Sequence, residues 1–292
     1  MTVMVMVIAE AGCNHMGRMD LALQLIESAV ICGATAIKFQ KRCPRELLTP
    51  AEYAAPHPVP RNAYGPTYGA HREALELTAA QHAQLQRRCM ELGIIYSTSV
   101  WDLTSAREIA ALKPAYIKIP SAHNTNYPLL EFLCTAYEGE LHLALGMTTR
   151  AEEQELVDFL DRHGRLGDCV LYACTSGYPV ADDELCLREI TRLRETWGAR
   201  LKGVGFSGHH TGTAPDIAAL TLGAECIERH FTLDRTFKGT DHAASLEPYA
   251  LHQLCAGLQS AERALAFKDR ELLTVEEVQR AKLKYRPAPP QP

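Results

Sequence analysis

Eight short runs of apolar and β-branched residues recur along the 292-residue chain, and they constrain its fold more than any other feature. The runs occupy residues 3–10, 36–40, 94–99, 116–121, 141–146, 170–175, 203–209 and 226–231. Between them lie segments with the apolar period of an amphipathic helix, and glycine follows several of these segments, as it often follows helices. This eightfold alternation predicts an α/β fold, a single-domain TIM (β/α)8 barrel over residues 1–283. An open doubly wound sheet is the alternative that the pattern leaves open.

Two segments depart from the alternation. Residues 43–77 form the longest stretch without a strand or helix period, and they are rich in Pro, Tyr, Gly and His. Irregular segments of this length inside a compact domain usually have a function or are disordered. Residues 284–292 include the proline-rich sequence RPAPPQP, which predicts an extended tail.

Composition narrows the class of ligand. The net charge is −5 and no block of basic residues is present, which argues against nucleic acid and membranes as partners and favours a small ligand. The ten cysteines are scattered singly without Cys-x-x-Cys spacing, as expected of buried thiols in a reducing compartment. The apolar N-terminus lacks a basic region and reaches Glu10 too early for a signal peptide. We therefore expect a cytoplasmic protein.

Polar or ionisable side chains stand at the predicted ends of seven of the eight strands, strand five being the exception. Active sites of TIM barrels lie at the C-terminal ends of the strands. The side chains are those of Glu10, Asn14, His15, Lys38, Gln40, Ser97, Thr98, Lys118, Ser121, Thr175, Ser176, Tyr178, Ser207, His209, His210 and His230. Taken singly, each lysine is explained as a solvated charge and each histidine as a structural residue. Because they recur at the same end of successive strands, we interpret them together as an active site.

Two kinds of chemistry follow from these residue types. Lysines with several hydroxyls and no nearby acid form an anion site, so Lys38 and Lys118 predict binding of a phosphate or a carboxylate. Three hydroxyl residues supply directional donors to it, namely Thr98, Ser121 and Ser207.

Two histidines on neighbouring strands suit a metal. His209 and His230 can face one another across the barrel mouth and hold one divalent ion with open positions. If the barrel closes, Glu10 is on the adjacent strand, where it could complete the coordination sphere or act as acid and base. The alternative is a pair of structural histidines.

Six ordered motifs point to a known family. They are IAEAGCNHMG (8–17), GATAIKFQ (33–40), YIKIPSAHNTNYPLL (116–130), CTSGYP (174–179), GFSGHHTG (205–212) and ERHFTLDRTFKGTDHAASLEP (228–248). In these motifs the chain resembles the phosphoenolpyruvate-condensing sialic acid synthases, which make N-acetylneuraminate and the related legionaminic, pseudaminic and deaminated nonulosonic acids. The resemblance extends from residue 8 to about residue 283. It implies a TIM barrel that joins phosphoenolpyruvate to an aldose or N-acylhexosamine, or to its phosphate, and releases phosphate.

The resemblance also implies a role for each site residue. His209 and His230 would hold a divalent ion of the manganese type, with magnesium or cobalt as alternatives, and Glu10 would act beside the reacting centre. The residues that would bind phosphoenolpyruvate are Lys38, Thr98, Lys118, Ser121, Thr175, Ser176 and Ser207. Those that would bind the sugar are Asn14, His15, Gln40, Tyr178 and Asp241. A homodimer is a further expectation.

The chain departs from the family pattern at several positions. Gly208 replaces a common aspartate, His123 replaces a glutamate, and Leu145 replaces a serine or threonine, for which Thr148 or Thr149 could substitute. Well-studied members continue into a small antifreeze-protein-like lid domain, which we do not expect after residue 292. The segment 43–77 is therefore the expected cover of the site.

Residues of this segment that could contact a sugar are Arg61, Tyr64, Tyr68, His71 and Arg72. Two other functions stay open. A metal-dependent aldolase that uses free pyruvate would explain the barrel and the histidines but not so many anion donors. A non-catalytic sugar-binding barrel would not need both the lysines and the metal ligands.

Overall fold

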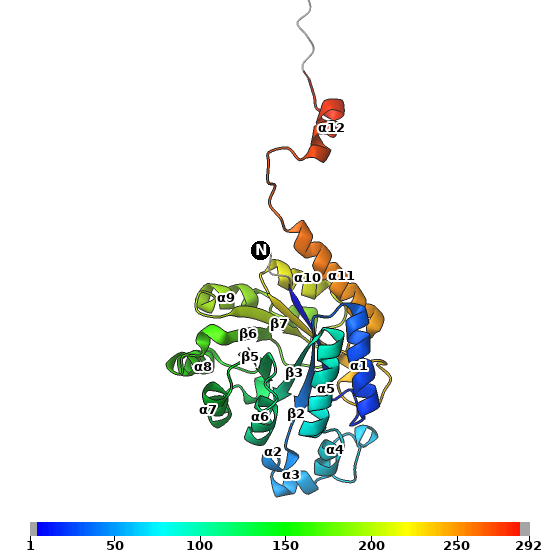
Figure 1. Ribbon diagram of the computed structural model, residues 1–292, viewed down its shortest axis with the longest axis vertical. Coiled ribbons are helices and arrows are strands. Elements are labelled where there is room, and N and C mark those ends of the chain that lie inside the picture. Colours follow the sequence, from blue (N-terminus) through cyan, green and yellow to red (C-terminus); the bar gives the residue numbers. More distant parts are fainter. Residues whose placement is uncertain (1–4, 287–292) are drawn as a thin grey trace, which may run out of the picture.

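The protein forms a closed barrel of eight parallel strands in a computed structural model that describes residues 5–286 (Figure 1). The strands are β1 (Met6–Gly12), β2 (Ala36–Lys41), β3 (Ile95–Val100), β4 (Tyr116–Ile119), β5 (Glu140–Ala144), β6 (Cys169–Cys174), β7 (Gly203–Gly208) and β8 (Cys226–His230). They pair in chain order, and β1 pairs with β8 to close the ring. The TIM barrel prediction is confirmed, and the open sheet is excluded.

Eight helices surround the strands. They are α1 (Met19–Cys32), α5 (Ala79–Leu92), α6 (Leu103–Ala110), α7 (Tyr127–Ala136), α8 (Arg150–Arg162), α9 (Arg188–Trp197), α10 (Ala214–Thr221) and α11 (Pro248–Ala264). Each turns an apolar stripe inward; α1, for example, buries Leu21, Leu25 and Ile26 at helical spacing. It ends at Gly33, whose φ of 89° lies in the left-handed region that glycine tolerates best. The main core therefore lies between the barrel and this outer layer.

The segment 43–77 is more regular than the sequence predicts. It contains α2 (Pro44–Leu47), α3 (Pro50–Ala54), η1 (Pro60–Asn62) and α4 (Tyr68–Ala74). Thr49 and Thr67 cap α3 and α4 by accepting hydrogen bonds from backbone N–H groups, and three of the four helices have proline in their first turn. The expectation of an irregular segment was wrong because caps and prolines stabilise helices too short for an apolar period.

Four short 3₁₀ helices lie in other loops: η2 (Ser121–His123), η3 (Leu166–Asp168), η4 (Asp182–Glu184) and η5 (His242–Ala244). The last helix, α12 (Thr274–Leu283), stands away from the barrel (Figure 1). The body of the barrel thus ends with α11, earlier than residue 283. Of the predicted tail, only residues 284–286 are described; the rest lies outside the described residues.

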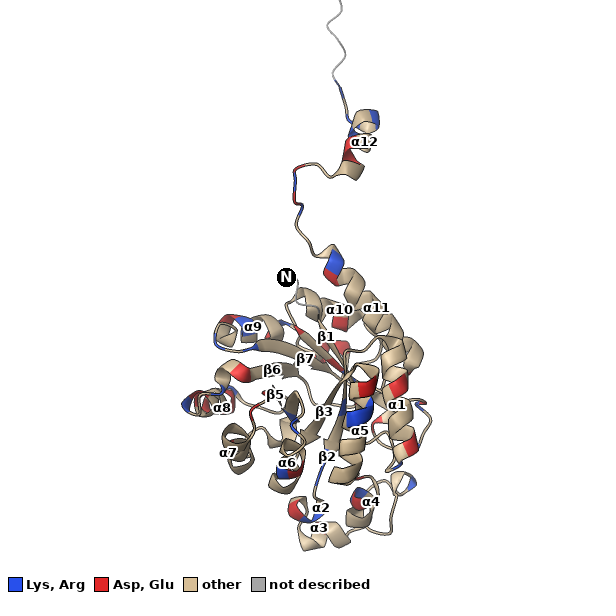
Figure 2. Ribbon diagram, in the orientation of Figure 1, with Lys and Arg blue, Asp and Glu red and all other residues tan. Residues whose placement is uncertain are grey.

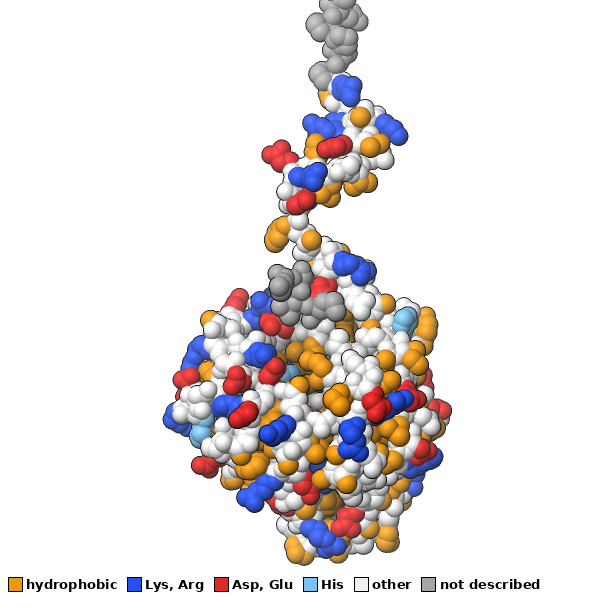
Figure 3. All heavy atoms as spheres, viewed as in Figure 1, with side chains coloured by type: hydrophobic (Ala, Val, Ile, Leu, Met, Phe, Trp, Pro, Cys, Tyr) orange, Lys and Arg blue, Asp and Glu red, His pale blue; other side chains and the backbone are white. Residues whose placement is uncertain are grey.

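On the face shown in Figure 3, side chains of both charges are intermixed with apolar ones, and Figure 2 shows the elements that carry the charged residues. All ten cysteines are free thiols, and of these only Cys186 is exposed. Within residues 5–286, no helix is both long and apolar enough to cross a membrane.

Candidate active site

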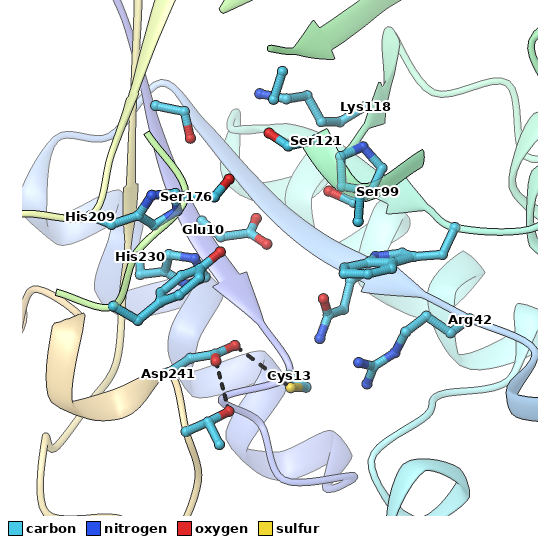
Figure 4. Close-up of a pocket in the computed structure, with 18 of the residues that line it drawn as sticks. Glu10, Cys13, Arg42, Ser99, Lys118, Ser121, Ser176, His209, His230 and Asp241 are labelled. Atoms are coloured by element: carbon cyan, nitrogen blue, oxygen red, sulfur yellow. Dashed lines mark hydrogen bonds between the residues drawn. The ribbon is translucent and has the colours of Figure 1, made fainter. Parts of the chain in front are cut away.

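A cavity of about 510 Å³ opens at the C-terminal ends of the barrel strands (Figure 4). Most of the residues that the sequence predicts for the site line it: Glu10, Lys38, Gln40, Lys118, Ser121, Ser176, Tyr178, Ser207, His209, His230 and Asp241. These residues come from six strands or the loops that follow them. The structure thus brings them together at the predicted end of the barrel.

Two lysines and two glutamates form a buried cluster in the floor of this cavity. Lys118 Nζ lies 3.1 Å from Glu228 Oε2 and 3.3 Å from the ring centroid of Tyr172. Lys38 Nζ lies 2.5 Å from Glu10 Oε2 and 3.8 Å from Glu228 Oε2. The expectation of lysines without a nearby acid was wrong, because Glu228 and Glu10 both reach them.

The sequence contained a signal for Glu228 that was overlooked. Side chains two residues apart on a strand point to the same face. Glu228 stands two residues before His230 on β8, so it had to share the inward face with that histidine. Between them Arg229 points outward and forms a buried ion pair with Asp216.

Burial and charge together set the protonation of the cluster. Burial raises the pKa of Glu10 to about 8, an effect that the attraction of Lys38 only partly offsets. Burial alone would also raise the pKa of Glu228, but Lys118 and Lys38 lower it to about 2. At neutral pH Glu10 is therefore mostly protonated and Glu228 ionised. With Lys38 and Lys118 charged, the cluster keeps a net positive charge that suits an anion.

Serine hydroxyls surround this cluster. Ser207 Oγ donates to Glu228 Oε1 over 3.1 Å, and Lys38 Nζ donates to Ser99 Oγ over 2.6 Å. Ser121 Oγ accepts from the backbone N–H of Gly146 over 3.0 Å. A Cβ at Gly146 would lie 2.3 Å from Ser176 Oγ, so only glycine leaves space for both serines. The loop after β5 thus contributes space and a backbone donor, although no polar side chain stands at the end of that strand.

Two predicted phosphoenolpyruvate ligands do not line the cavity. Thr98 Oγ1 donates to Tyr96 Oη over 2.6 Å on the helix-facing side of β3, because strand alternation points Ser99 inward instead. Thr175 Oγ1 donates to the carbonyl of Glu184 over 2.9 Å. We correct both assignments: Ser99 takes the place predicted for Thr98, and Thr175 acts through its backbone carbonyl.

The backbone carbonyl of Thr175 orients His209, the first of two neighbouring histidines. His209 Nδ1 lies 3.1 Å from Thr175 O and donates to it, which leaves the Nε2 lone pair free. The ring centroids of His209 and His230 are 5.4 Å apart. His210, the next residue, points away from the cavity and contacts Asp216 and Arg229.

The electrostatics of the pair fit metal ligands. Burial and the neighbouring His230 lower the pKa of His209 to about 4, and burial also lowers the pKa of His230. Both rings are therefore neutral at physiological pH, as metal binding requires. His230 Nδ1 is buried and has no hydrogen-bond partner among the described residues.

No group of three or more His, Cys, Asp or Glu side chains gathers as a metal cage in the part of the chain that the structure describes. A divalent ion would have two imidazole ligands here and would take its remaining ligands from water or substrate.

The wall beside the histidines carries the predicted sugar contacts. Tyr178 lies over His209 with ring centroids 4.4 Å apart, and Gln40 and Asp241 also line the cavity. Asp241 accepts a hydrogen bond from Thr240 Oγ1 over 2.8 Å. Although burial opposes it, the neighbouring imidazole of His230, the hydrogen bond from Thr240 and the charge of Arg42 lower the pKa of Asp241, which keeps it an acceptor for hydroxyls.

Asn14 and His15 lie behind this wall and do not line the cavity. Asn14 Nδ2 donates to Phe231 O over 2.9 Å and to Ser245 Oγ over 3.0 Å, and His15 Nδ1 accepts from the N–H of Gly17. We correct their predicted role as sugar ligands. They hold the loops that follow β1 and β8, where their polar atoms are already satisfied.

The mouth of the cavity holds residues that the strand-end pattern could not find. Some belong to segment 43–77 and others follow β1, β2 and β3; they include Cys13, Arg42, His57, Tyr68, His71, Arg72 and Trp101. Of the residues predicted for a covering loop, Tyr68, His71 and Arg72 line the cavity, whereas Arg61 and Tyr64 do not.

The family departures lie at the edge of the site. His123 packs against Trp101 with centroids 5.4 Å apart and does not line the cavity. Thr148 Oγ1 donates to the carbonyl of Gly146, and Thr149 caps α8, so neither hydroxyl lines the cavity. Neither takes over the function expected at Leu145.

Comparisons with known proteins agree with this architecture. The model of the NeuB family matches residues 25–270. The chain is 35% identical over 274 residues to human N-acetylneuraminate-9-phosphate synthase, covering 92% of this chain and 74% of that one. It is 32% identical to the N,N'-diacetyllegionaminic acid synthase of Campylobacter jejuni over 89% of this chain and 77% of that one.

A solved structure agrees as well. The N-acetylneuraminic acid synthetase of Leptospira borgpetersenii, in complex with citrate, superposes with a TM-score of 0.80 at 26% identity, covering 97% of this chain and 93% of that one. The named relatives are synthases of sialic-type sugar acids, transferases that form a carbon–carbon bond. The chain is an enzyme of this kind and belongs to the NeuB family.

Proposed function

We propose that the enzyme condenses phosphoenolpyruvate with the aldehyde of an aldose or N-acylhexosamine, giving a 2-keto-3-deoxy sugar acid and phosphate. One observation carries the proposal: a single cavity joins a cationic, hydroxyl-rich floor to a pair of neutral histidines. The floor suits an anionic donor, and the histidines suit a divalent ion beside an aldehyde. A site that bound only an anion would not need the histidines, and a site that bound only a metal would not need the cationic floor.

Phosphoenolpyruvate would bind over Lys38 and Lys118. The buried cluster keeps a net positive charge, and charge-assisted hydrogen bonds from ammonium groups to a phosphate or carboxylate are among the stronger polar contacts in proteins. Serines 99, 121, 176 and 207 line the same region and can donate directional hydrogen bonds. Glu228 holds both ammonium groups in place before the substrate arrives.

His209 and His230 would hold the divalent ion, for which manganese is our first choice and magnesium or cobalt the alternatives. A bound ion of this type supplies Lewis acidity toward an aldehyde oxygen. The carbonyl of Thr175 keeps His209 in the tautomer that can ligate, and Tyr178 covers the ring from the solvent side. Asp241 and Gln40 would orient the hydroxyls of the sugar.

Glu10 would act as the general acid that protonates the aldehyde oxygen. With its pKa raised to about 8 it carries a proton at neutral pH, and it pairs with His230 in the β1–β8 register. When the enol carbon of phosphoenolpyruvate forms the new bond to the aldehyde carbon, the aldehyde oxygen gains negative charge, and Glu10 can donate its proton to it. Water then adds to the resulting oxocarbenium carbon, and phosphate leaves.

An aldolase that uses free pyruvate is the second candidate, because it would also use the barrel and the histidines. The experiment is product analysis by mass spectrometry after incubation with a panel of hexoses and hexosamines, each offered with phosphoenolpyruvate or with pyruvate. We expect a sugar acid and one equivalent of phosphate with phosphoenolpyruvate only. Product formation from pyruvate would overturn the proposal in favour of the aldolase.

A further inference from the structure

We propose that Tyr172, held in place by His142, is a positioning residue for Lys118 and thereby for the anionic donor at the floor of the cavity. This inference rests on the proposed function, in which Lys118 binds phosphoenolpyruvate. Lys118 lines the cavity and Tyr172 does not, so the tyrosine acts through the lysine and not by contact with substrate. Its role follows from the side chains that fill the barrel beneath Lys118.

Three polar rings occupy the interior of the barrel below the cavity. Barrel interiors of this kind are mostly packed with branched aliphatic side chains. Here they contain Tyr116, His142 and Tyr172, from β4, β5 and β6, each 1% exposed or less. Each stands two residues before a residue of the same strand that lines the cavity, so strand alternation turns it inward. Filling space would not require polar rings, so their polar atoms need a further reason.

A chain of hydrogen bonds fixes the ring of Tyr172. Its Oη lies 2.7 Å from His142 Nδ1, and His142 Nε2 lies 3.4 Å from Glu140 Oε2 at the partly exposed start of β5. The hydrogen bond with His142 lowers the pKa of Glu140, and burial lowers the pKa of His142 to about 4. The carboxylate is therefore ionised and the imidazole neutral. Glu140 accepts the Nε2 proton of that imidazole, so Nδ1 accepts the hydrogen of the Tyr172 hydroxyl.

The fixed ring presents a face to Lys118. A Cβ at Gly205, the neighbour of Tyr172 in the β6–β7 register, would lie 2.5 Å from Cε1 of the ring, so glycine leaves the space that the ring occupies. Lys118 Nζ lies 3.3 Å from the ring centroid. The negative face of an aromatic ring attracts an ammonium group, and the attraction is larger where water is excluded. Because the hydroxyl donates its hydrogen to His142, the ring becomes richer in electrons and attracts the ammonium more strongly.

Lys118 is the floor lysine that needs this support. Burial lowers its pKa, and among the described residues Glu228 is the one side chain that accepts a hydrogen bond from its ammonium group. Lys38, the other floor lysine, has two oxygen partners of its own, at 2.5 and 2.6 Å. Tyr172 contacts Lys118 from a side that is not part of the cavity, so it fixes the ammonium group without occupying the place of the anion.

The first experiment weakens the face of the ring at nearly constant size. Tyr172→Phe is compared with phenylalanines at the same position that carry one, two and three ring fluorines, because fluorine withdraws electrons from the ring face. Tyr172→Phe should keep the KM for phosphoenolpyruvate within about 3-fold of wild type, and the KM should then rise stepwise with fluorination, to about 10- to 30-fold. The KM for the sugar should change little. A KM for phosphoenolpyruvate that stays constant or falls along the series overturns the inference.

Tyr96 provides the matched control. It is also a buried tyrosine whose Oη contacts a histidine, at 2.8 Å from His82 Nδ1, but it lies on the helix-facing side of β3. The same series at Tyr96 should leave both KM values unchanged. Thermal unfolding of every variant measures loss of stability separately, and stability lost at Tyr172 without the stepwise rise in KM contradicts a positioning role.

Calorimetry of phosphoenolpyruvate binding without sugar separates this inference from the proposed function. Tyr172→Met, which fills space without an aromatic face, should weaken binding about 10- to 30-fold. His142→Leu should weaken binding in the wild-type background but not in Tyr172→Phe, which has no hydroxyl to hold. If the wild type binds no phosphoenolpyruvate, both the proposed function and this inference fail. If it binds and Tyr172→Met binds equally well, or if His142→Leu acts equally in both backgrounds, this inference alone fails.

Discussion

Lys118 shows how single residues at this site depend on their neighbours. The side chain is 2% exposed, and burial lowers its pKa, yet Glu228 and the face of Tyr172 compensate its charge. A buried charge that lost this partner would be strongly destabilising. The same argument makes Lys118 the best single residue with which to test anion binding at the floor of the cavity.

Replacing Lys118 with methionine should weaken the binding of phosphoenolpyruvate. One charge-assisted contact is typically worth about 1.5 to 3 kcal/mol, so Lys118→Met should raise the KM for phosphoenolpyruvate about 10- to 100-fold, with a smaller change for the sugar. Steady-state kinetics with each substrate varied in turn measures this. Lys202→Met, which removes a surface lysine paired with Glu140, is the control. An unchanged KM and kcat for phosphoenolpyruvate would place the anion elsewhere.

A substitution at His230 tests whether the enzyme needs a bound metal ion. The ring is buried with an unpartnered Nδ1, so His230→Ala should abolish metal-dependent turnover and bound metal while far-ultraviolet circular dichroism stays that of the wild type. Wild type treated with chelator should match the variant, and added manganese should restore only the wild type. Full wild-type activity in excess chelator would contradict a catalytic ion at this pair.

At the scale of elements, the short helices of segment 43–77 form one wall of the mouth. Helices α3 and α4 pack so closely that a Cβ at Gly69 would lie 2.3 Å from the ring of Tyr53. Tyr64 Oη donates to the carbonyl of Lys238, and Lys238 Nζ donates to the carbonyl of Ala63. The segment is therefore joined to the loop after β8, which also carries Asp241.

Trimming this wall should affect the acceptor sugar selectively. Replacing residues 64–71 by a short glycine-serine linker removes Tyr68 and His71 from the cavity but leaves its floor intact. We expect the KM for the sugar to rise far more than the KM for phosphoenolpyruvate. The measurement is the pair of KM values in wild type and variant. If sugar kinetics stay unchanged, the segment packs against the barrel without contacting substrate.

At the scale of the whole molecule, buried neutral histidines make stability depend on pH. Burial lowers the pKa of His82 to about 3 and those of His15, His142 and His209 to about 4. The unfolded chain, with histidine pKa values near ~6.5, binds more protons than the folded one between these limits. The free energy of unfolding should therefore fall as pH drops from about 6.5 to about 4.

His82→Leu tests this linkage away from the active site. His82 is fully buried against Tyr96, so its replacement should reduce the slope of unfolding free energy against pH by at most about one proton, or roughly 1.4 kcal/mol per pH unit. Urea denaturation at several pH values between 4 and 6.5 measures the slope. His252→Leu is the control, because the side chain of His252 is exposed to water in the folded as well as in the unfolded chain. Equal slopes in wild type and His82→Leu would show that His82 is not part of the linkage.

The sequence by itself determined the barrel and most of its active end. Eight apolar runs separated by segments of helical period are compatible with few folds. The bounds of each predicted run agree with those of a strand to within a few residues. Residues such as Lys38, Lys118, His209 and His230 were predictable because the ends of parallel strands meet at one edge of a barrel.

Only the tertiary structure decided which of these side chains face the cavity and what charge they carry. Thr98 and Ser99 are adjacent in the sequence, and the pleat of β3 alone turns one outward and the other inward. The pKa of Glu10 is raised by burial and only partly lowered again by Lys38, 28 positions away. Arg72 reaches the mouth only through the packing of the short capped helix α4. Protonation and direction depend on distances between segments far apart in the chain, which local sequence patterns do not contain.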